Sequence, residues 1–513
     1  MTGGVDGGDG VEGRDADRGN PAVAGHAADA GRHTDAHEVT AADGRAITRR
    51  QLLVGASVAG LSGVAAGALL GHYATGGSGG GDEGAGRSVP SGGASGPQLG
   101  VVMPGDPRPD APELAHRGPF GVGVRGWTVT NPDQIDVVHY LAGGPVPRYD
   151  RPLPLMVWYP AVIPAHTAEL TTYSDVLGSG NDPMRPNLPF EFAGRALRGA
   201  APDTARGPYP LLIVSHGYPG SDVLLTNLTE NLASKGYVVV AIQHTDSTHG
   251  DAAGITSTLL NRPLDIDFVL NQMAALGAKG SGSFLAGLVD AGTTALIGYS
   301  MGGYGVLICA GAGIAAAAAA AGAASGAPRG ALKVLEAGTA QHAALVDPRV
   351  KAIVPIAPWG GAFGVWEAAA LKGIKVPALF VVGDRDQTAP YAGVRFIFEH
   401  AIDADRYLLV HQSGDHEVAV NPAPPITFTR WREYVHYQEP ALDNTRTNNV
   451  NQHFLTAFLG LHLKGADYQA YLDVKQADSN VANNESNPGY PAGIWKGFPE
   501  WSAVGLELHH LRP

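Results

Sequence analysis

The chain has 513 residues and carries 35 basic against 48 acidic side chains, which gives it a formal net charge of −13 at pH 7. This acidic balance disfavours nucleic acids and anionic membrane surfaces as partners, because both attract basic patches. The single cysteine, Cys309, excludes an intrachain disulfide, so a hydrophobic core must stabilise the fold.

The N-terminal part of the chain has the composition of a leader. Residues 1–47 are mostly Gly, Ala, Asp and His, and we expect them to be disordered. Arg49 and Arg50 then precede an uncharged stretch of small and apolar residues, a pattern typical of the twin-arginine export signal. We therefore predict a signal segment over 48–74, contact with the twin-arginine export machinery, and an extracellular or cell-surface location. A permanent membrane anchor is the alternative, which the many Ala and Gly residues disfavour. Whether the signal is cleaved stays open.

A Gly- and Ser-rich stretch follows the signal and predicts a flexible linker over 75–118. The chain beyond it is long enough for one large domain, 119–475, in which apolar runs alternate with helical patterns. This alternation predicts an α/β fold with a mostly parallel sheet that helices cover on both faces. The expected strands are 155–159, 211–215, 237–242, 294–297, 377–382 and 406–410, and the expected helices include 223–235 and 264–276.

Three further segments complete the domain plan. Residues 311–338 are mostly Ala and Gly and predict a loose helical insertion, which serves either as a lid or as a tolerated loop. Apolar residues from Phe454 to Leu461 repeat at helical spacing and predict an amphipathic helix on the sheet. The C-terminal extension, 476–513, shows too little periodicity for a helix or a strand, but its aromatic residues predict packing onto the domain.

The candidate nucleophile is Ser300. It lies in GYSMGG at 298–303, directly after the apolar run TTALI and before a stretch of small residues with helical character. The G-x-S-x-G motif in this context is typical of a nucleophile elbow, in which a tight strand-to-helix turn presents the serine hydroxyl. Serine is a weak nucleophile by itself, so the motif requires a base, an acid and oxyanion donors elsewhere.

Candidates for the acid and the base follow two later strands, in the chain order that this architecture uses. Asp384 and Asp386 come after the strand at 377–382, and His411, Asp415 and His416 come after the strand at 406–410. Only histidine has an ordinary pKa near neutrality, so a histidine must move the proton.

Two backbone amides are candidates for the oxyanion hole. One is the amide of Met301, the residue after the nucleophile, and the other belongs to the loop after the strand at 211–215, where Tyr218 is the expected donor. Neither side chain needs to be special, because the backbone supplies both hydrogen bonds.

The chain from about residue 118 onward resembles a family of bacterial α/β hydrolases. This family groups predicted dienelactone hydrolases with platelet-activating-factor acetylhydrolase-like and cutinase-like polyesterases. The segments that carry the resemblance are LPLMVWYPA, SHGYPGS, LASKGYVVVAIQH, GYSMGGYG, DPRVKAIVPIAPWGG, VPALFVVGDRDQTAP and SGDHEV. The resemblance implies an α/β-hydrolase fold with insertions.

The resemblance also assigns roles to residues. It implies Ser300 as nucleophile, Asp386 as the acid and His416 as the base, with Trp359 as an aromatic wall beside the substrate. True dienelactone hydrolases use a cysteine nucleophile, so the serine here argues for ordinary carboxylic esters instead. His411 is the competing base, and Trp359 is equally well explained by core packing.

Other ligand chemistries find little support in the sequence. His216, His244 and His249 are interpreted as residues that hold loops by hydrogen bonding. No H-E-x-x-H motif or cysteine pair points to zinc, and the G-x-G-x-x-G match at 121–126 lacks the flanking strand and helix of a dinucleotide site. We therefore expect neither a metal nor a cofactor.

The sequence thus predicts a serine hydrolase of neutral or apolar carboxylic esters, with a small or polymeric substrate. The alternative is a catalytically inactive binding protein at the cell surface on the same fold. The acyl and alcohol parts of the substrate and the oligomeric state stay open.

Overall fold

The computed structural model describes residues 103–180, 182–482, 495–500 and 502–513. The expected disordered region, the twin-arginine segment and the first part of the expected linker lie outside these residues. Among the described helices, none is both long enough and apolar enough to cross a membrane.

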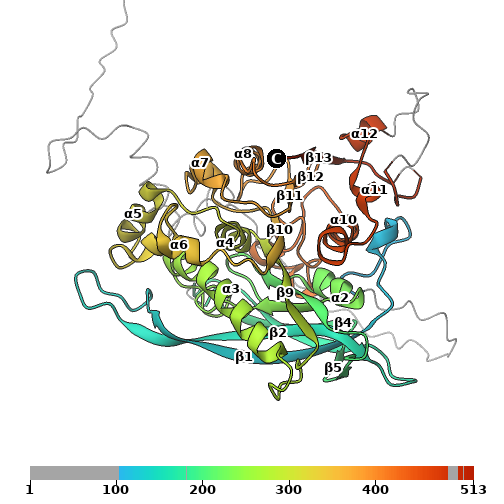
Figure 1. Cartoon of the computed structure of the whole chain (residues 1–513), viewed down its shortest axis with the longest axis horizontal. Coiled ribbons are helices and arrows are strands. Elements are labelled where there is room, and N and C mark those ends of the chain that lie inside the picture. Colours follow the sequence, from blue (N-terminus) through green and yellow to red (C-terminus); the bar gives the residue numbers. More distant parts are fainter. Residues whose placement is uncertain (1–102, 181, 483–494, 501) are drawn as a thin grey trace, which may run out of the picture. The chain divides into compact units, whose positions relative to one another are not determined.

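An 11-stranded sheet forms the centre of the domain (Figure 1). Its strands are β1 (Gly121–Ile135), β2 (Arg148–Val162), β5 (Leu197–Arg198), β6 (Ala201–Pro202), β7 (Tyr209–Ser215), β8 (Val238–Ile242), β9 (Val289–Tyr299), β10 (Val350–Ile356), β11 (Ala378–Gly383), β12 (Arg406–His411) and β13 (Leu506–Leu511). They lie in the order β13-β12-β11-β10-β9-β7-β8-β2-β1-β5, and β6 pairs with β2. Strands β7 to β12 run parallel, whereas β1, β2 and β13 join by antiparallel pairing. This is an α/β-hydrolase fold, as the sequence predicts.

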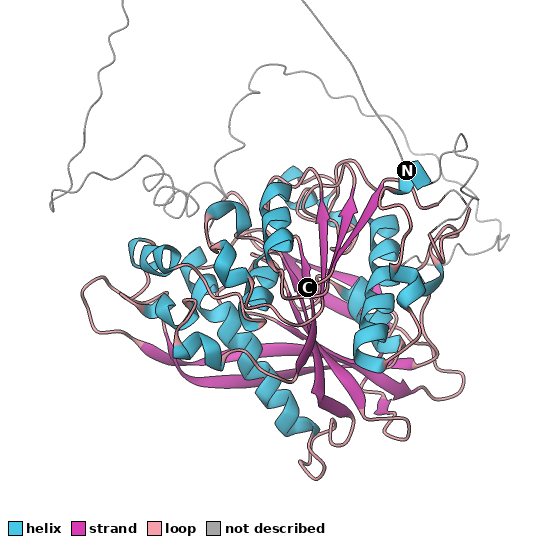
Figure 2. Cartoon of the chain, turned by 45° about the horizontal axis from the view of Figure 1, so that its top comes forward, coloured by secondary structure: helices cyan, strands magenta, loops and turns pink. Residues whose placement is uncertain are grey.

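Helices cover both faces of this sheet (Figure 2). The helices are α2 (Thr226–Ser234), α3 (Ile255–Gly277), α4 (Met301–Cys309), α5 (Ala316–Ala324), α6 (Ala340–Ala344), α7 (Ala368–Leu371), α8 (Tyr391–His400), α9 (Trp431–Tyr434), α10 (Asn444–Lys464), α11 (Gln469–Leu472) and α12 (Ser479–Ala482), with 3-10 turns η1 (Glu113–Ala115), η2 (Ala331–Leu335), η3 (Gly361–Phe363) and η4 (Pro425–Thr427). One core cluster holds residues of α3, α4 and α8, and the other holds residues of α2 and α10. Because both faces are covered, the inner strands β8 and β11 are apolar and buried along their whole length.

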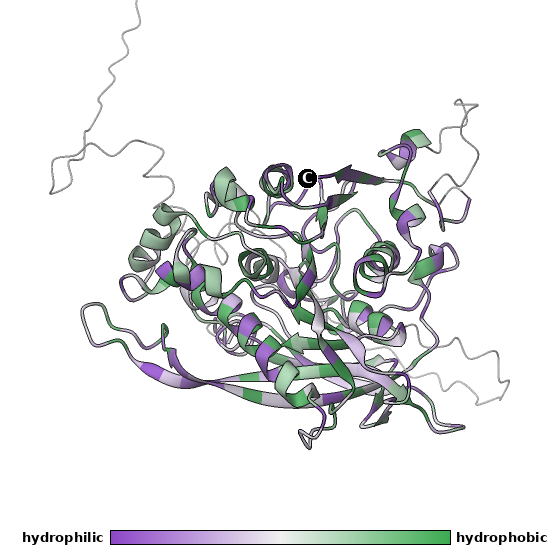
Figure 3. Cartoon of the chain, viewed as in Figure 1, coloured by the Kyte–Doolittle hydropathy of each residue, from purple (hydrophilic) through white to green (hydrophobic). Residues whose placement is uncertain are grey.

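Helix α4 lies at the centre of the molecule and every one of its residues is buried. In Figure 3 it carries no strongly hydrophilic residue and so lacks the polar stripe of a surface helix. Cys309, its last residue, is buried and its thiol donates to the carbonyl of Pro263 at 3.4 Å. The helix that follows the elbow is therefore enclosed by protein on all sides.

A small two-stranded sheet, β3 (Thr171–Leu177) and β4 (Leu188–Gly194), lies outside the main one. The Ala- and Gly-rich insertion holds α5 and η2. It is tied to the start of α3 by a hydrogen bond of 2.6 Å from Thr256 Oγ1 to the carbonyl of Ser325. This contact holds the middle of the insertion, and whether the insertion serves as a lid or is a tolerated loop stays open.

Helix α3 begins nine residues earlier than the sequence predicts, at Ile255 instead of residue 264. Pro263 lies inside this helix, and proline cannot donate the hydrogen bond to the carbonyl four residues before it. In the structure that carbonyl, of Leu259, accepts a hydrogen bond of 2.9 Å from the hydroxyl of Tyr304 on α4. A side chain from a neighbouring helix thus satisfies the carbonyl, and the helix continues through the proline.

The C-terminal extension contains a strand that the sequence analysis missed. Strand β13 pairs antiparallel with β12 along its full length and forms the edge of the sheet. Leu506 and Leu508 are buried, whereas Glu507 and His509, which follow them in turn, are half-exposed, and this alternation is typical of a strand with one buried face. The expectation of no regular element was therefore wrong here, whereas the aromatic residues Trp495 and Phe498 do pack on Phe454.

Residues 103–118, which the sequence analysis assigned to the linker, lie against the domain. Ala115 in η1 is completely buried and its carbonyl accepts a hydrogen bond of 2.7 Å from Asn231 on α2. The amide of Arg108 donates to Asn449 on α10 at 3.0 Å. The boundary at residue 118 was therefore placed too late.

Candidate active site

The site begins at the sharp turn between β9 and α4. Ser300 adopts φ 54° and ψ −115°, a backbone conformation that is costly for a residue with a side chain. Flanking glycines make the turn possible: a Cβ on Gly298 would come within 2.3 Å of the carbonyl oxygen of Gly302, and one on Gly302 within 1.9 Å of that of Ser215. The structure therefore has the strained elbow that the GYSMGG motif predicts.

Three side chains that lie far apart in the sequence form a continuous chain of hydrogen bonds. Nε2 of His416 lies 2.9 Å from Oγ of Ser300, and Nδ1 of His416 lies 2.8 Å from Oδ2 of Asp386. Ser300 is 5% exposed, His416 is 6% exposed and Asp386 is 4% exposed, so little water surrounds these hydrogen bonds. The strands β9, β11 and β12 bring them together at their C-terminal ends.

The structure distinguishes Asp386 from its neighbour Asp384. The other carboxylate oxygen of Asp386 accepts hydrogen bonds from the amides of Thr388 at 2.8 Å and Ala389 at 2.6 Å, which fix its direction. Asp384 instead accepts from the amide of Ser413 at 2.7 Å. Asp386 therefore orients the histidine, and Asp384 holds the adjoining loop.

His411, the competing candidate for the base, is paired with a residue outside the triad. It is the last residue of β12, it is fully buried, and its Nε2 lies 2.9 Å from Oδ1 of Asn451 on α10. Burial lowers the pKa of His411 to about 4, so the ring is neutral at ordinary pH. His411 is a structural residue in the core beneath the site.

Carboxylates dominate the electrostatics around His416. Burial by itself lowers the pKa of its imidazole, but the charge of Asp386 and the hydrogen bond to it, with Glu417 and Asp415 nearby, outweigh burial and raise this pKa to about 9. Burial raises the pKa of Glu417 to about 8 and that of Glu439 to about 7. The surroundings therefore stabilise the imidazolium form of His416, which is the form that a general base reaches during reaction.

The two residues expected to supply the oxyanion donors lie close to Ser300 along the chain or in space. A Cβ built on Gly217 would lie 3.4 Å from Cβ of Ser300, so the loop after β7 passes directly beside the nucleophile. Tyr218 follows in that loop, and its hydroxyl donates to the carbonyl of Ala253, away from the amide. Met301 is the first residue of α4, where a backbone N–H has no acceptor within its own helix.

Trp359 contributes to the site through its backbone. Its amide donates a hydrogen bond of 3.1 Å to the carbonyl of Ser300, which supports the elbow. Its ring stacks on Phe363 with centroids 5.0 Å apart and lies edge-on to Tyr304, and the residue is only 8% exposed. Packing accounts for most of this side chain, and contact with a substrate stays a prediction.

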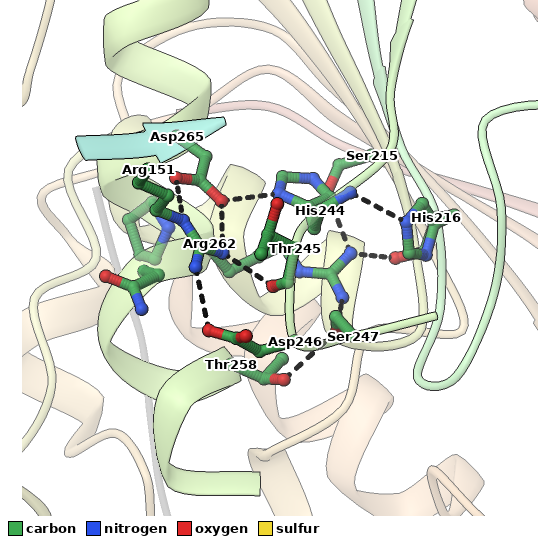
Figure 4. A network of polar contacts seen from close by, with 12 residues as sticks. Arg151, Ser215, His216, His244, Thr245, Asp246, Ser247, Thr258, Arg262 and Asp265 are labelled. Atoms are coloured by element: carbon green, nitrogen blue, oxygen red, sulfur yellow. Dashed lines mark hydrogen bonds and ion pairs between the residues drawn. The ribbon is translucent and has the colours of Figure 1, made fainter. Parts of the chain in front are cut away.

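A buried polar network lies beneath the oxyanion loop (Figure 4). His244 bridges Ser215 at 2.9 Å and Asp265 at 2.9 Å, while Nδ1 of His216 donates to the carbonyl of Gly217 at 2.7 Å. His249 donates to the carbonyl of Gly178. These histidines hold loops, as the sequence analysis interpreted them.

Three charged members of this network escaped the sequence analysis. Arg151, Arg262 and Asp265 are each 1% exposed. Arg151 forms a two-pronged ion pair with Asp265 at 2.9 and 3.0 Å. The available signal was the presence of an arginine and an aspartate on the otherwise apolar face of helix α3, in RPLDI.

Within the described part of the chain, no group of three or more His, Cys, Asp or Glu side chains could hold a metal ion. The polar residues at the elbow are instead paired with one another. The arrangement of Ser300, His416 and Asp386 is suited to acyl transfer by a serine nucleophile.

Comparison with known proteins matches the part of the chain that contains the elbow. A family model described as PETase, PET hydrolase-like, matches residues 199–329, which span β7, the oxyanion loop, α3 and the elbow. The protein is a carboxylic ester hydrolase of the serine hydrolase class. None of the curated proteins compared with this esterase matches it. Among solved structures, a ferulic acid esterase from Streptomyces cinnamoneus is 20% identical with a TM-score of 0.47, over 78% of this chain and 99% of that one.

Proposed function

We propose that this chain is an exported serine esterase that cleaves apolar esters, polyesters among them, through a Ser300–His416–Asp386 triad. The observation that carries the proposal is the unbroken series of hydrogen bonds from Ser300 Oγ through both ring nitrogens of His416 to the Asp386 carboxylate. Export rests on the twin arginine at Arg49 and Arg50 alone.

Acylation follows from the positions of these groups. Nε2 of His416 takes the hydroxyl proton of Ser300 as its oxygen attacks the ester carbonyl carbon, and the imidazolium that forms is stabilised by Asp386. The amides of Tyr218 and Met301 stabilise the negative charge that develops on the carbonyl oxygen. The same proton then passes to the leaving alcohol as the ester bond breaks, which leaves an acyl-enzyme on Ser300.

Deacylation repeats these steps with water. His416 removes a proton from the water molecule as it attacks the acyl carbonyl, and it returns this proton to Ser300 as the carboxylic acid leaves. The enzyme ends with the protonation state in which it began. No redox partner and no second substrate other than water are required.

Two observations support a large apolar substrate over a small one. The matched family model is described as PET hydrolase-like, and PET is a polyester. In addition, the segment that follows His416 exposes two large aromatic side chains, Phe428 at 67% and Trp431 at 66%. Exposed aromatic groups of this size are typical of binding surfaces.

These aromatic side chains lie on a segment that is tied to the oxyanion loop. The ring of His436, shortly after α9, packs on that of His249 with centroids 4.7 Å apart. The neighbouring Thr248 forms a β-bridge with Gly220, two residues after Tyr218. The segment that carries Phe428 and Trp431 is therefore linked, through His249 and Thr248, to the loop that passes beside Ser300.

The inactive binding protein is the second candidate. The intact hydrogen-bond chain argues against it, because a protein without catalysis has no need for a strained serine held against a histidine and an aspartate. The two hypotheses differ in whether the serine reacts.

The test is ester hydrolysis by the purified full chain and by Ser300→Ala. A series of p-nitrophenyl esters from acetate to decanoate and an aliphatic polyester film are the substrates. We expect hydrolysis of both by the natural chain, and a loss of about 10⁶-fold in kcat for the variant. The exposed serine Ser174 supplies the control Ser174→Ala, which keeps full activity. Equal activity in Ser300→Ala and the natural chain, with equal thermal stability, would refute the proposal.

A further inference from the structure

The guanidinium of Arg262 lies directly beneath the oxyanion loop (Figure 4). Nη1 donates to the carbonyl of His216, and Nη2 donates to the carbonyl of Gly217 at 3.1 Å and to Oγ of Ser247 at 2.5 Å. Arg262 comes from the middle of α3 and is 1% exposed. Its hydrogen bonds therefore connect the central helix of one face to the two residues that precede Tyr218.

This arginine has no carboxylate of its own among the described residues. Asp265, the acid nearest to it on the helix, forms its ion pair with Arg151 at 2.9 Å. Burial lowers the pKa of Arg262 to about 9, so it still carries a positive charge at neutral pH. Since burial of an unpaired cation is unfavourable, a purely structural role does not explain why an arginine occupies this position.

The bond to Gly217 has a direct consequence for the amide of Tyr218. The carbonyl of Gly217 and the N–H of Tyr218 belong to one planar peptide unit, so they point in opposite directions. Nδ1 of His216 donates to the same oxygen at 2.7 Å. Two donors on one side of the peptide thus hold its N–H on the opposite side.

We propose that Arg262 is a positioning residue for the oxyanion hole, which orients and polarises the Gly217–Tyr218 peptide so that its N–H meets the oxyanion. A cation on the carbonyl oxygen draws electron density from the peptide and makes its N–H a stronger donor. The inference rests on the proposed function, because it takes the amide of Tyr218 as an oxyanion donor. It adds a residue that never touches the substrate.

The test compares an ester with its thionoester, in which sulfur replaces the carbonyl oxygen. Sulfur accepts hydrogen bonds weakly, so the ratio of kcat/KM for p-nitrophenyl acetate to that for p-nitrophenyl thionoacetate reports on the oxyanion hole. We expect Arg262→Lys to lower kcat for the ester by about 10- to 10²-fold, with KM little changed, because the amide is displaced. The ratio of kcat/KM for the ester to that for the thionoester should fall as well, because the rate with the thionoester decreases less.

The matched control is Arg151→Lys, which perturbs the same network without touching the carbonyls of the loop. Arg151 bonds to Asp265, Asp246 and the carbonyl of Thr245. We expect this variant to lower thermal stability while the ester to thionoester ratio stays at the natural value. An equal fall in the ratio for both arginine variants would overturn the inference, and so would an unchanged ratio in folded Arg262→Lys.

If Arg262→Lys does not fold, Ser247→Ala gives a milder test. This change removes the Ser247 hydroxyl, which accepts a hydrogen bond from Nη2 of Arg262. We therefore expect a smaller fall in the same ratio of kcat/KM values. An unchanged ratio in folded Ser247→Ala overturns the inference in that case. Failure of the proposed function is distinguishable, because the natural chain itself would then not hydrolyse p-nitrophenyl acetate.

Discussion

At the scale of single residues, the proposed chemistry depends on how the surroundings of His416 balance its charge. Burial opposes the imidazolium, but the charge and hydrogen bond of Asp386 together with the charges of Glu417 and Asp415 outweigh burial, so the pKa of His416 lies above its ordinary value. A general base must be neutral to accept a proton, so activity should rise with pH through this raised pKa. The acid limb of the kcat/KM profile is therefore expected above pH 6.5.

Glu417 offers a way to test this balance without altering the triad. Its carboxylate is one of the charges that raise the pKa of His416, and it ionises near the pKa of about 8 that burial gives it. In Glu417→Gln we expect the acid limb to move to lower pH by roughly one unit or less, with the plateau of kcat unchanged. The measurement is the pH profile of p-nitrophenyl acetate hydrolysis.

Glu399 is the matched control for this prediction, because it lies on α8 in an exposed ion pair with Arg395. Glu399→Gln should leave the acid limb in place. A shift of the limb to higher pH in Glu417→Gln would contradict the electrostatic account.

The sequence could predict these catalytic candidates because the elbow motif has a fixed spacing and the fold has a fixed chain order for its acid and base. From the residues alone, Asp384 and Asp386 were equivalent, as were His411 and His416. The family resemblance chose between them, and the structure shows the contacts that separate each pair. Arg262 could not be found, because its role depends on the direction of a peptide in a loop from another part of the chain.

At the scale of secondary structure, the central parallel strands were predictable because each is a continuous apolar run. Helix α3 and strand β13 were not. The start of α3 depends on a hydroxyl from Tyr304, which sequence rules for proline do not consider. Strand β13 is short and half polar, and only the unpaired edge of β12 gives it a partner.

Strand β13 supports the strand whose end leads to His416, and it offers a matched pair of leucines. Leu508 is 2% exposed and Leu511 is 39% exposed on the same strand. We expect Leu508→Ala to lower the free energy of unfolding by about 2–5 kcal/mol because it leaves a cavity in the core, and Leu511→Ala to lower it far less. Urea denaturation followed by circular dichroism measures both, and equal effects would show that β13 does not pack as described.

At the scale of the whole molecule, the exposed aromatic surface of Phe428 and Trp431 separates two kinds of substrate. A small soluble ester needs only the elbow, whereas a polymer surface must also adhere beside it. The net charge of −13 makes a neutral polyester a more suitable surface than an anionic one.

We therefore expect Trp431→Ala to reduce the release of soluble products from a polyester film by up to about 10-fold, because an aromatic contact is worth about 0.5–1.5 kcal/mol. Hydrolysis of p-nitrophenyl acetate should stay within twofold of the natural rate, since Trp431 takes no part in the hydrogen bonds that join Ser300, His416 and Asp386. The exposed residue Leu141, at 78% on the loop between β1 and β2, supplies the control Leu141→Ala. Parallel losses on the film and on the soluble ester would show that Trp431 is not a polymer-binding residue.

The central claim is that Ser300 is a reactive nucleophile activated by His416. Its most direct test is labelling of the full chain with a fluorophosphonate, followed by mass spectrometry of the digested peptides. We predict a single phosphonylated residue, Ser300, with no labelling when His416 is replaced by Ala. A label on another residue, or none on the folded natural chain, would contradict the account.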